Sequence, residues 1–358
     1  MNRPLNRFCW VALFCFWKWT KADASRLRSI HMLYFVYKSV TIIYGGGWVE
    51  SKKNSSLMGY MLVFTSGFLW GLGGYFVTRM SAVGATSLIT AFSGHFFAIL
   101  PLLIILLVTK GVEGLKISKK GLFYSILLGA LTKGVFKLAG DTAITMIGVA
   151  TSSILMYLAP FFAAIMSVIF FKEKLRKHQI FSLGLNLLGC VLMVTGGNFS
   201  GLSISGIGLA LGILAGFLYA LNTILGKVAA SGDDPLTMTF YMLVFSMLTM
   251  AIFAKPWEHV DLFMNSTFLF WAIISSMCTG LFANIFFLRG LSMDVDASKV
   301  TIITSVEVIV ATLSGVFLLN EQINFAGFIG ILFMIASIVG MNIELPLKTI
   351  KVPETDTI

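Results

Sequence analysis

The chain has 358 residues, of which 57% are hydrophobic and only 12% are charged, and its mean hydropathy is +0.90. Soluble domains contain about half apolar and about a quarter charged residues, so this composition argues against a water-soluble globular protein. The net charge of +10 does not indicate nucleic acid, because residues 1–57 hold nine Lys/Arg against Asp23 and Glu50. The four cysteines form neither a CxxC pair nor a disulfide framework, so no metal site and no disulfide-stapled secreted fold are expected.

Residues 1–57 do not follow the pattern of the rest of the chain. A basic start, an apolar run and a small-residue stretch imitate a signal peptide, but cleavage there would invert the charge distribution given below. Met58 resembles a natural start, so we expect the segment before it to be poorly ordered or not translated in the cell. An amphipathic surface anchor rich in Trp and Arg is the alternative.

The remaining apolar residues fall into ten blocks of about 20 residues, the length of a helix that crosses a hydrocarbon core of about 30 Å. The predicted spans are 58–78, 86–108, 121–140, 148–171, 178–196, 205–226, 236–254, 268–288, 298–319 and 324–343. The sequence therefore predicts an all-α, polytopic membrane bundle of ten transmembrane helices.

The basic residues of the predicted loops are distributed unevenly between the two sides of the membrane. One side carries fifteen: Lys52, Lys53, Lys110, Lys116, Lys119, Lys120, Lys172, Lys174, Arg176, Lys177, Lys227, Arg289, Lys299, Lys348 and Lys351. The other side carries two, Arg79 and Lys255. Because Lys and Arg are retained in cytoplasmic loops, we expect a multi-pass protein of the plasma membrane with both termini in the cytoplasm.

Two pairs of similar segments indicate an internal repeat. Residues 169–175 (IFFKEKL) lie 148 positions before residues 317–323 (FLLNEQI), which places Glu173 over Glu321. Residues 66–70 (SGFLW) align with residues 215–219 (AGFLY) at a spacing of 149. These spacings predict two five-span repeats, 58–196 and 205–343, followed by a cytoplasmic tail, 344–358. An odd number of spans inverts the second repeat, an arrangement that many secondary transporters use to alternate access to a midplane site.

The opening of span 1, Leu158-Ala-Pro160 in span 4 and the paired FFKEKL and LLNEQI blocks together resemble the EamA family of the drug/metabolite transporter superfamily. The resemblance covers about 58–343. It implies a 5+5 inverted-repeat fold that moves small metabolites such as amino acids, amines or carboxylates, with helices 5 and 10 peripheral to the cavity. Second repeats of the family often read Glu-Pro in helix 9, where this chain has Glu307-Val308, so the resemblance does not carry a proline hinge over to that helix.

Two ionisable side chains at mid-depth are the first candidates for a substrate site, because charges inside spans cost about 2.5–3.5 kcal/mol each and require a reason. Lys133 in span 3 and Glu307 in span 9 lie roughly 18 Å and 14 Å from the same side at 1.5 Å per residue. Either Lys133 faces the cavity and attracts a carboxylate while Glu307 tunes it or binds an amine, or the two form a closed bridge between their helices. Lys137, which is nearer the end of its helix, is expected to snorkel.

Aromatic and amide side chains complete the candidate site. Trp70 and Tyr219 occupy equivalent mid-span positions, away from the interfacial belt where such residues usually lie, and therefore suit a site lining. Close helix packing through Gly67, Gly71, Gly212 and Gly216 is the competing explanation for those two segments. The further candidates are His95, Tyr157, Asn222 and Asn284, each of which could instead bond a neighbouring helix. Pro160 is expected to bend span 4 or to expose a carbonyl group there.

These features favour a secondary transporter of small polar metabolites that works by alternating access. A membrane-embedded enzyme or ligand-binding protein on the same bundle is the alternative. Phosphate-loop, HExxH and GxSxG motifs are all absent from the sequence, so we expect no enzymatic activity and no cofactor. The expected partners are a small-molecule substrate and membrane lipid, with a second copy of the chain as a further candidate, and not nucleic acid.

Overall fold

The computed structural model describes residues 52–199, 205–320 and 322–342, and these ranges contain helices and no β-strand. The predictions for Glu321 and the tail, and most of those for the N-terminal extension, lie outside the described residues. The first repeat consists of α3 (Lys52–Gly71), α4 (Gly73–Ser81), α5 (Ser87–Lys110), η1 (Val112–Leu115), α6 (Lys119–Ile126), η2 (Leu127–Val135), α7 (Phe136–Met156), α8 (Ala159–Phe171) and α9 (Lys177–Thr195).

The second repeat begins at α10. It consists of α10 (Gly206–Ala229), α11 (Pro235–Ala254), η3 (Pro256–Glu258), α12 (Val260–Met264), α13 (Ser266–Ser275), η4 (Ser276–Phe282), α14 (Ala283–Leu291), α15 (Ala297–Thr304), α16 (Val306–Leu319) and α17 (Phe325–Asn342). Within the described ranges, nine helices are long and apolar enough to cross a membrane, and Ala159–Phe171 is a shorter apolar helix. Together they form the predicted polytopic bundle.

The longest helical stretch, Lys119–Met156, is two crossings joined at Gly148. This glycine has φ 76° and ψ 165°, which breaks the helix. Before it, Thr132 bonds Asn222 of α10 at 3.0 Å, and Gly140 lies against Ala215. The contacts therefore move backward along α10 as the chain advances. From the break at Gly148 onward they move forward, from Gly208, which lies beside Ile147 at the break, to Gly212 and Gly216 beside Leu155. Residues 149–171 are thus the predicted fourth span, interrupted between α7 and α8.

The internal repeat is visible in the backbone geometry as well as in the sequence. We number the transmembrane helices 1 to 10 after the ten predicted spans, so that helix 3 contains α6 and η2 and helix 8 contains α13, η4 and α14. Helix 3 and helix 8 each contain a π-helical segment, Leu127–Val135 and Ser276–Phe282. Helix 4 is interrupted at Tyr157 and helix 9 at Ser305, which are 148 positions apart. Lys172 and Asn320, also 148 positions apart, end their helices in the left-handed conformation. The same irregularities therefore recur at equivalent places in both halves.

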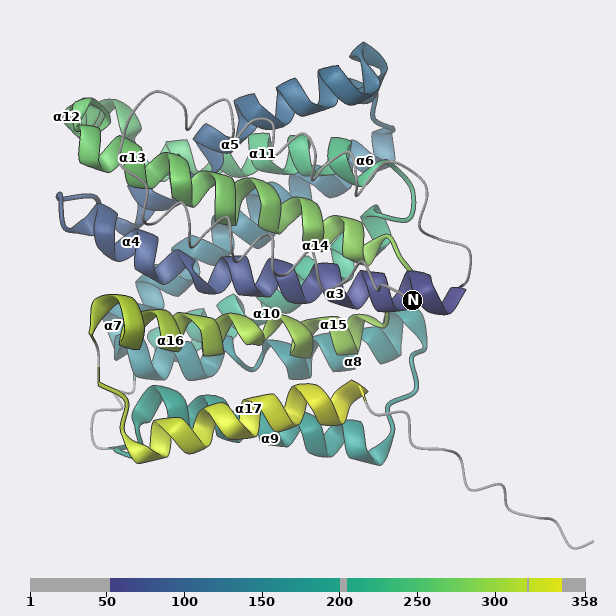
Figure 1. Ribbon diagram of the computed structural model, residues 1–358, viewed down its shortest axis with the longest axis vertical. Helices are drawn as coiled ribbons and strands as arrows, with labels where there is room; N and C mark the ends of the chain where they lie inside the picture. The colour runs from purple at the N-terminus through teal and green to yellow at the C-terminus, as the bar shows by residue number, and fades with distance from the viewer. Residues whose placement is uncertain (1–51, 200–204, 321, 343–358) are drawn as a thin grey trace, which may run out of the picture. The chain divides into compact units, whose positions relative to one another are not determined.

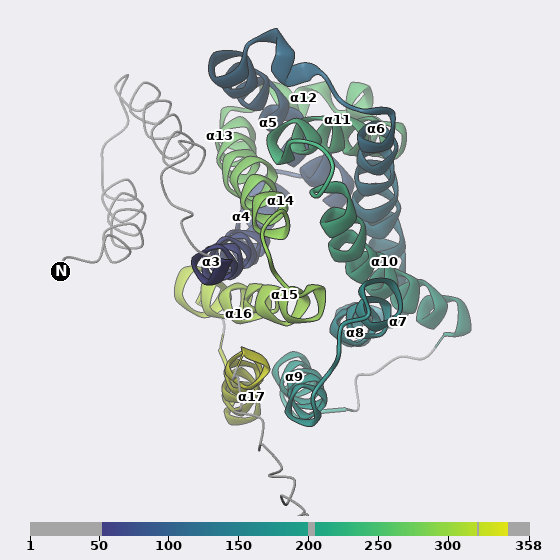
Figure 2. The ribbon, with the colours of Figure 1, turned by 90° about the vertical axis from the view of Figure 1, so that its right-hand side faces the viewer.

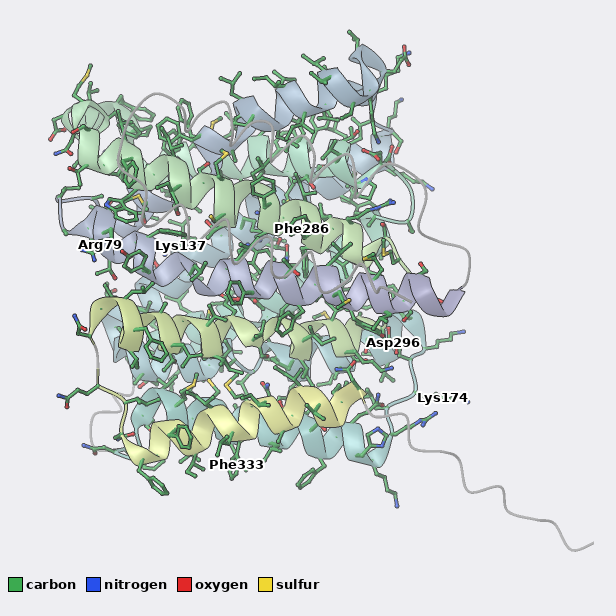
Figure 3. The ribbon with its side chains drawn as sticks, in the orientation of Figure 1. Arg79, Lys137, Lys174, Phe286, Asp296 and Phe333 are labelled. Carbon is green, nitrogen blue, oxygen red and sulfur yellow. The ribbon has the colours of Figure 1, made fainter. Side chains whose placement is uncertain are left out.

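The helices lie roughly parallel to a common axis, and the described chain begins and ends on the same side of the bundle (Figure 1). We call this side the basic end; its turns are residues 111–118, 172–176, 230–234 and 292–296. Figure 3 shows Lys174 and Asp296 at this end, and Arg79 and Lys137 toward the opposite end. Viewed along the axis, α9 and α17 pair with each other at one edge (Figure 2), so helices 5 and 10 are peripheral.

Glycines of helices 1 and 6 pack directly against the two interruptions. A β-carbon at Gly67 would lie 3.0 Å from the carbonyl oxygen of Thr304, and one at Gly216 would lie 2.6 Å from that of Leu155. These contacts confirm the close packing expected of these small residues. Helix 9 is interrupted although it lacks the proline of the Glu-Pro sequence. In helix 4, Pro160 occupies the first turn of α8, where its missing N–H costs no hydrogen bond.

Gly71→Ala tests this packing. Its new β-carbon would lie 2.6 Å from both the carbonyl oxygen of Glu307 and Cβ of Val310. We expect a destabilisation of about 1–3 kcal/mol from overpacking, measured as a lower midpoint of thermal unfolding in detergent. The control is Gly74→Ala in the adjoining α4, where no atom of the other described residues, apart from the backbone of its own helix, lies within 4 Å of the new methyl group. Equal midpoints for the two variants would contradict the packing.

Candidate functional site

Lys133 lies in the π-helical segment of helix 3 and approaches an aromatic ring of helix 1. Its Nζ is 4.5 Å from the ring centroid of Trp70, and both side chains are partly buried. A desolvated cation over a Trp face gains about 2 kcal/mol or more. The indole is itself fixed, because Nε1 donates to the carbonyl oxygen of Thr279 at 3.1 Å and the ring packs 5.1 Å from Phe287. Helices 1 and 8 therefore hold the surface on which Lys133 rests.

Glu307 is held on the other side of the site by a residue of helix 6. It lies in the first turn of α16, directly after the interruption of helix 9, where backbone N–H groups favour a negative charge. The Tyr219 hydroxyl donates to Glu307 Oε2 at 2.6 Å, and the Tyr219 ring lies 5.8 Å from Phe136. Tyr157, at the equivalent interruption of helix 4, lies close enough to Glu307 to interact with its charge and packs against the cluster that contains Val308 and Ile309. The two interruptions thus meet at one polar centre.

Lys133 and Glu307 are close enough to interact electrostatically. In the described part of the chain, however, no ion pair within 4.0 Å joins them, so the closed bridge considered above is not formed. Each charge has another partner, the Trp70 ring for the lysine and the Tyr219 hydroxyl for the glutamate. Similar depth along two helices does not fix the direction in which each side chain points. The structure leaves two opposite charges near each other without mutual neutralisation.

Two of the three remaining candidates, His95 and Asn222, hold the helices around this centre. His95 Nδ1 lies 3.3 Å from the Ser246 hydroxyl of α11, and the imidazole interacts electrostatically with Lys133. Asn222 of α10 accepts a hydrogen bond from Thr132, the residue that precedes Lys133. Both contacts are the interhelical bonds that the competing explanation predicted.

Asn284 has a different role, at the π-helical segment of helix 8. Its Nδ2 donates to the carbonyl oxygens of Thr279 at 3.0 Å and Gly280 at 2.7 Å, while its buried Oδ1 accepts no hydrogen bond from the described residues. A π-helical turn disturbs the regular hydrogen-bond ladder and leaves such carbonyl groups available. Asn284 therefore stabilises the segment against which Trp70 is fixed.

Three residues at this centre were not among the site residues predicted from the sequence: Phe136, Thr132 and Thr279. The first two lie close to Lys133 in sequence, Thr132 directly before it and Phe136 three residues after it, and this proximity could have indicated them. Thr279 contributes a backbone carbonyl that accepts from both Trp70 and Asn284. Nothing in its side chain indicates this role, because it depends on the local helix geometry.

A bundle of two inverted five-helix repeats with interrupted helices at its centre is the architecture of a secondary transporter. The chain belongs to the EamA-like transporter family, whose model matches residues 57–195 and again residues 206–343. It is therefore a multi-pass membrane transporter, and the family resemblance found in the sequence is confirmed.

An individual relative and a solved structure are also similar to this chain. An uncharacterized transporter of Bacillus subtilis (strain 168), YyaM, is 28% identical over 167 residues, which are 43% of this chain and 52% of the relative. The chain thus matches about half the length of this curated relative. A solved crystal structure with 16% identity and a TM-score of 0.65 covers 82% of this chain and 97% of its own, which shows the fold alone.

A double-mutant cycle tests how Glu307 is held. We expect Tyr219→Phe and Glu307→Gln to lower the midpoint of thermal unfolding less than additively when combined, with a coupling of about 0.5–3 kcal/mol for directly contacting residues. The cycle of Lys133→Met with Glu307→Gln is the comparison and should give a smaller coupling, since no ion pair joins the two. A larger coupling in the lysine cycle would instead indicate the closed bridge.

Proposed function

We propose that the protein moves small polar metabolites of the amino acid, amine or carboxylate class by alternating access around the site between Lys133 and Glu307. The observation that carries this proposal is the separation of the two charges: Lys133 lies over Trp70 and Glu307 accepts from Tyr219. A ligand carboxylate has a cation to bind and a ligand amine has an anion. The aromatic walls suit an apolar part of the ligand, as in most small-molecule pockets.

The depth of the site supports this proposal. Lys133 lies 14 residues after Lys119 and Glu307 lies 10 residues after Ala297, which places them roughly 21 Å and 15 Å from the basic end at 1.5 Å per residue. A position near the middle of a membrane about 30 Å thick is where inverted-repeat transporters bind substrate. We therefore assign substrate binding to Lys133, Glu307, Trp70, Tyr219 and Tyr157. His95 and Asn222 position the surrounding helices, and Asn284 stabilises the π-helical segment of its own helix.

Lys133→Ala is the direct test of anion recognition. We expect it to weaken binding of carboxylates by at least about tenfold, because the only cation proposed to meet them is lost, and to leave amines bound. Binding is measured first as thermal shifts against amino acids, amines and short carboxylates, and then as flux into proteoliposomes.

The matched control is Lys137→Ala, one helical turn away, since Lys137 Nζ is bound 2.8 Å from Asp141 and 2.5 Å from the Ser87 hydroxyl. Equal losses of carboxylate binding in both variants would contradict the assignment of Lys133. Conversion of the ligand to a product, in place of unchanged flux, would favour the membrane-enzyme alternative.

We further propose that the protein lies in the plasma membrane with the basic end in the cytoplasm, on the distribution of Lys and Arg between the two ends. A cysteine at Gly232, in a turn of the basic end, should then react with an impermeant thiol reagent only from the inside of intact cells. A cysteine at exposed Ser81, at the opposite end, should react from the outside. The reverse pattern would invert the orientation, and labelling of both positions from one side would contradict the inverted repeat.

A further inference from the structure

One face of α10 runs as a polar ladder from the candidate site to the basic end. Tyr219, Thr223 and Lys227 are spaced by four residues and so lie on the same face of the helix. Tyr219 bonds Glu307, the Thr301 hydroxyl donates to the Thr223 hydroxyl at 3.4 Å, and Lys227 bonds Glu173 at 2.9 Å. The middle contact, between Thr223 and Thr301, is closed to solvent, since both side chains are 1% exposed. Helix 6 and the first half of helix 9 are therefore joined along their inner length.

Glu173 closes this ladder at the surface from the opposite repeat. It lies in the turn between α8 and α9 and accepts four hydrogen bonds: Lys227 Nζ at 2.9 Å, Ala297 N at 2.8 Å, Ser298 N at 3.2 Å and Ser298 Oγ at 2.7 Å. The residue at the N-cap of α15, Asp296, makes no side-chain cap bond and pairs instead with Lys299 at 3.0 Å. Glu173 thus caps α15 from a distant part of the chain, which satisfies N–H groups that a helix leaves free at its start.

The charge on Glu173 is well stabilised in this arrangement. Its side chain is 12% exposed and that of Lys227 is 22% exposed. Burial alone raises the pKa of Glu173, but the hydrogen bonds from Lys227, Ser298 and Ala297 outweigh it and bring the pKa below its ordinary value. The carboxylate is therefore ionised at neutral pH and makes charge-assisted hydrogen bonds to two helices of the second repeat, α10 and α15.

Small side chains fill the space beneath this network. Ala159 and Ala163 of α8, Ala220 and Ile224 of α10, and Ala297 of α15 form one buried cluster. A second ion pair between the repeats, Lys110 with Asp234, lies at the same end. The basic end is thus closed both by packing and by charge.

At the opposite end, the described positions equivalent to these are more exposed; Glu321, the counterpart of Glu173, lies outside the described residues. Ala297 is completely buried, whereas Val149, its counterpart 148 positions earlier, is 64% exposed. At the spacing of 149 that relates helices 1 and 6, the counterpart of Lys227 is the exposed Thr78. The next residue, Arg79, is also exposed and lies over the rings of Tyr75 at 5.1 Å and Trp271 at 5.9 Å. Within the described ranges Arg79 forms no ion pair. Two halves of similar sequence therefore have different contacts at the two ends.

We infer that Glu173 is the latch of a gate at the basic end, formed by α10 and α15, and that the structure is the state in which this gate is closed. When the gate opens, Lys227 and the start of α15 must break their hydrogen bonds to Glu173. The contact between Thr223 and Thr301 must also separate. This inference rests on the proposed transport function, because a gate has meaning only if the site alternates between the two ends.

The latch is tested by the accessibility of Thr301, which lies behind it. In a background without the native cysteines, Thr301→Cys is labelled with an impermeant thiol reagent from the basic end, with and without Glu173→Gln. We expect roughly tenfold faster labelling in the Gln variant, as follows from loss of hydrogen bonds to a charged group. The matched control is Glu113→Gln at the same end, whose partner is the exposed Lys116 within its own turn. Unchanged labelling of Thr301→Cys in the Glu173 variant would overturn the inference.

A second measurement does not depend on how well the Glu173 variant folds. Thr223→Cys and Thr301→Cys, combined in otherwise unaltered protein, replace the two hydroxyl groups that lie 3.4 Å apart. Oxidation should cross-link them and stop flux, and a reductant should restore it. Full flux through the cross-linked protein would overturn the gate. The labelling of Thr301→Cys needs no substrate, so a gate that opens in that measurement without flux of any tested metabolite would instead count against the proposed function.

Discussion

The interior of this bundle is organised by the cost of placing ionised side chains in a medium without water. A lysine and a glutamate at mid-depth are tolerated only with polar or aromatic partners, and here each has its own. Lys133 rests on Trp70, and Glu307 accepts from Tyr219. A direct ion pair would have neutralised both charges and left little attraction for a ligand. Holding the charges apart keeps each available, and it requires the aromatic residues of helices 1 and 6 to lie where they do.

That placement depends on helices that are irregular near the site. The interruption at Ser305 places Glu307 at the start of a half-helix, and Tyr157, at the interruption of helix 4, packs against the cluster that contains Val308 and Ile309, the residues after Glu307. Backbone groups freed inside a membrane must be satisfied by protein, since lipid offers no hydrogen bonds. Close approach of Gly67 and Gly216 keeps both interruptions covered by neighbouring helices. The glycines and the aromatic residues beside them thus serve the same site in two ways, as packing surface and as lining.

Much of this architecture follows from the sequence, because its signals are additive over many residues. Apolar length gives the spans, and the spacing of 148 between similar segments gives the inverted repeat. The contacts at the centre are different, because they depend on geometry that several helices impose together. The π-helical segment around Lys133 changes the direction of the side chains that follow it, so a regular helix projection misplaces them. Ser305 interrupts helix 9 without a proline, and this break is visible only once helix 1 is packed against it.

The asymmetry between the two ends gives the repeats their functional meaning. Two halves with the same backbone irregularities have the same packing choices available, yet Ala297 is buried and Val149 is exposed. If the halves exchange these arrangements, the site opens first to one side and then to the other without any new fold. Packing alone would make the state closed at the basic end and the state closed at the opposite end comparable in free energy. The charged network of Glu173 and Lys227 adds a directional bias, because the counterpart of Lys227 in helix 1 is the uncharged Thr78. The neighbouring Arg79 lies over aromatic rings that it can leave at lower cost. The resting state is therefore set by a few charged residues at the surface, and the path to the opposite state is set by the symmetry of the helices.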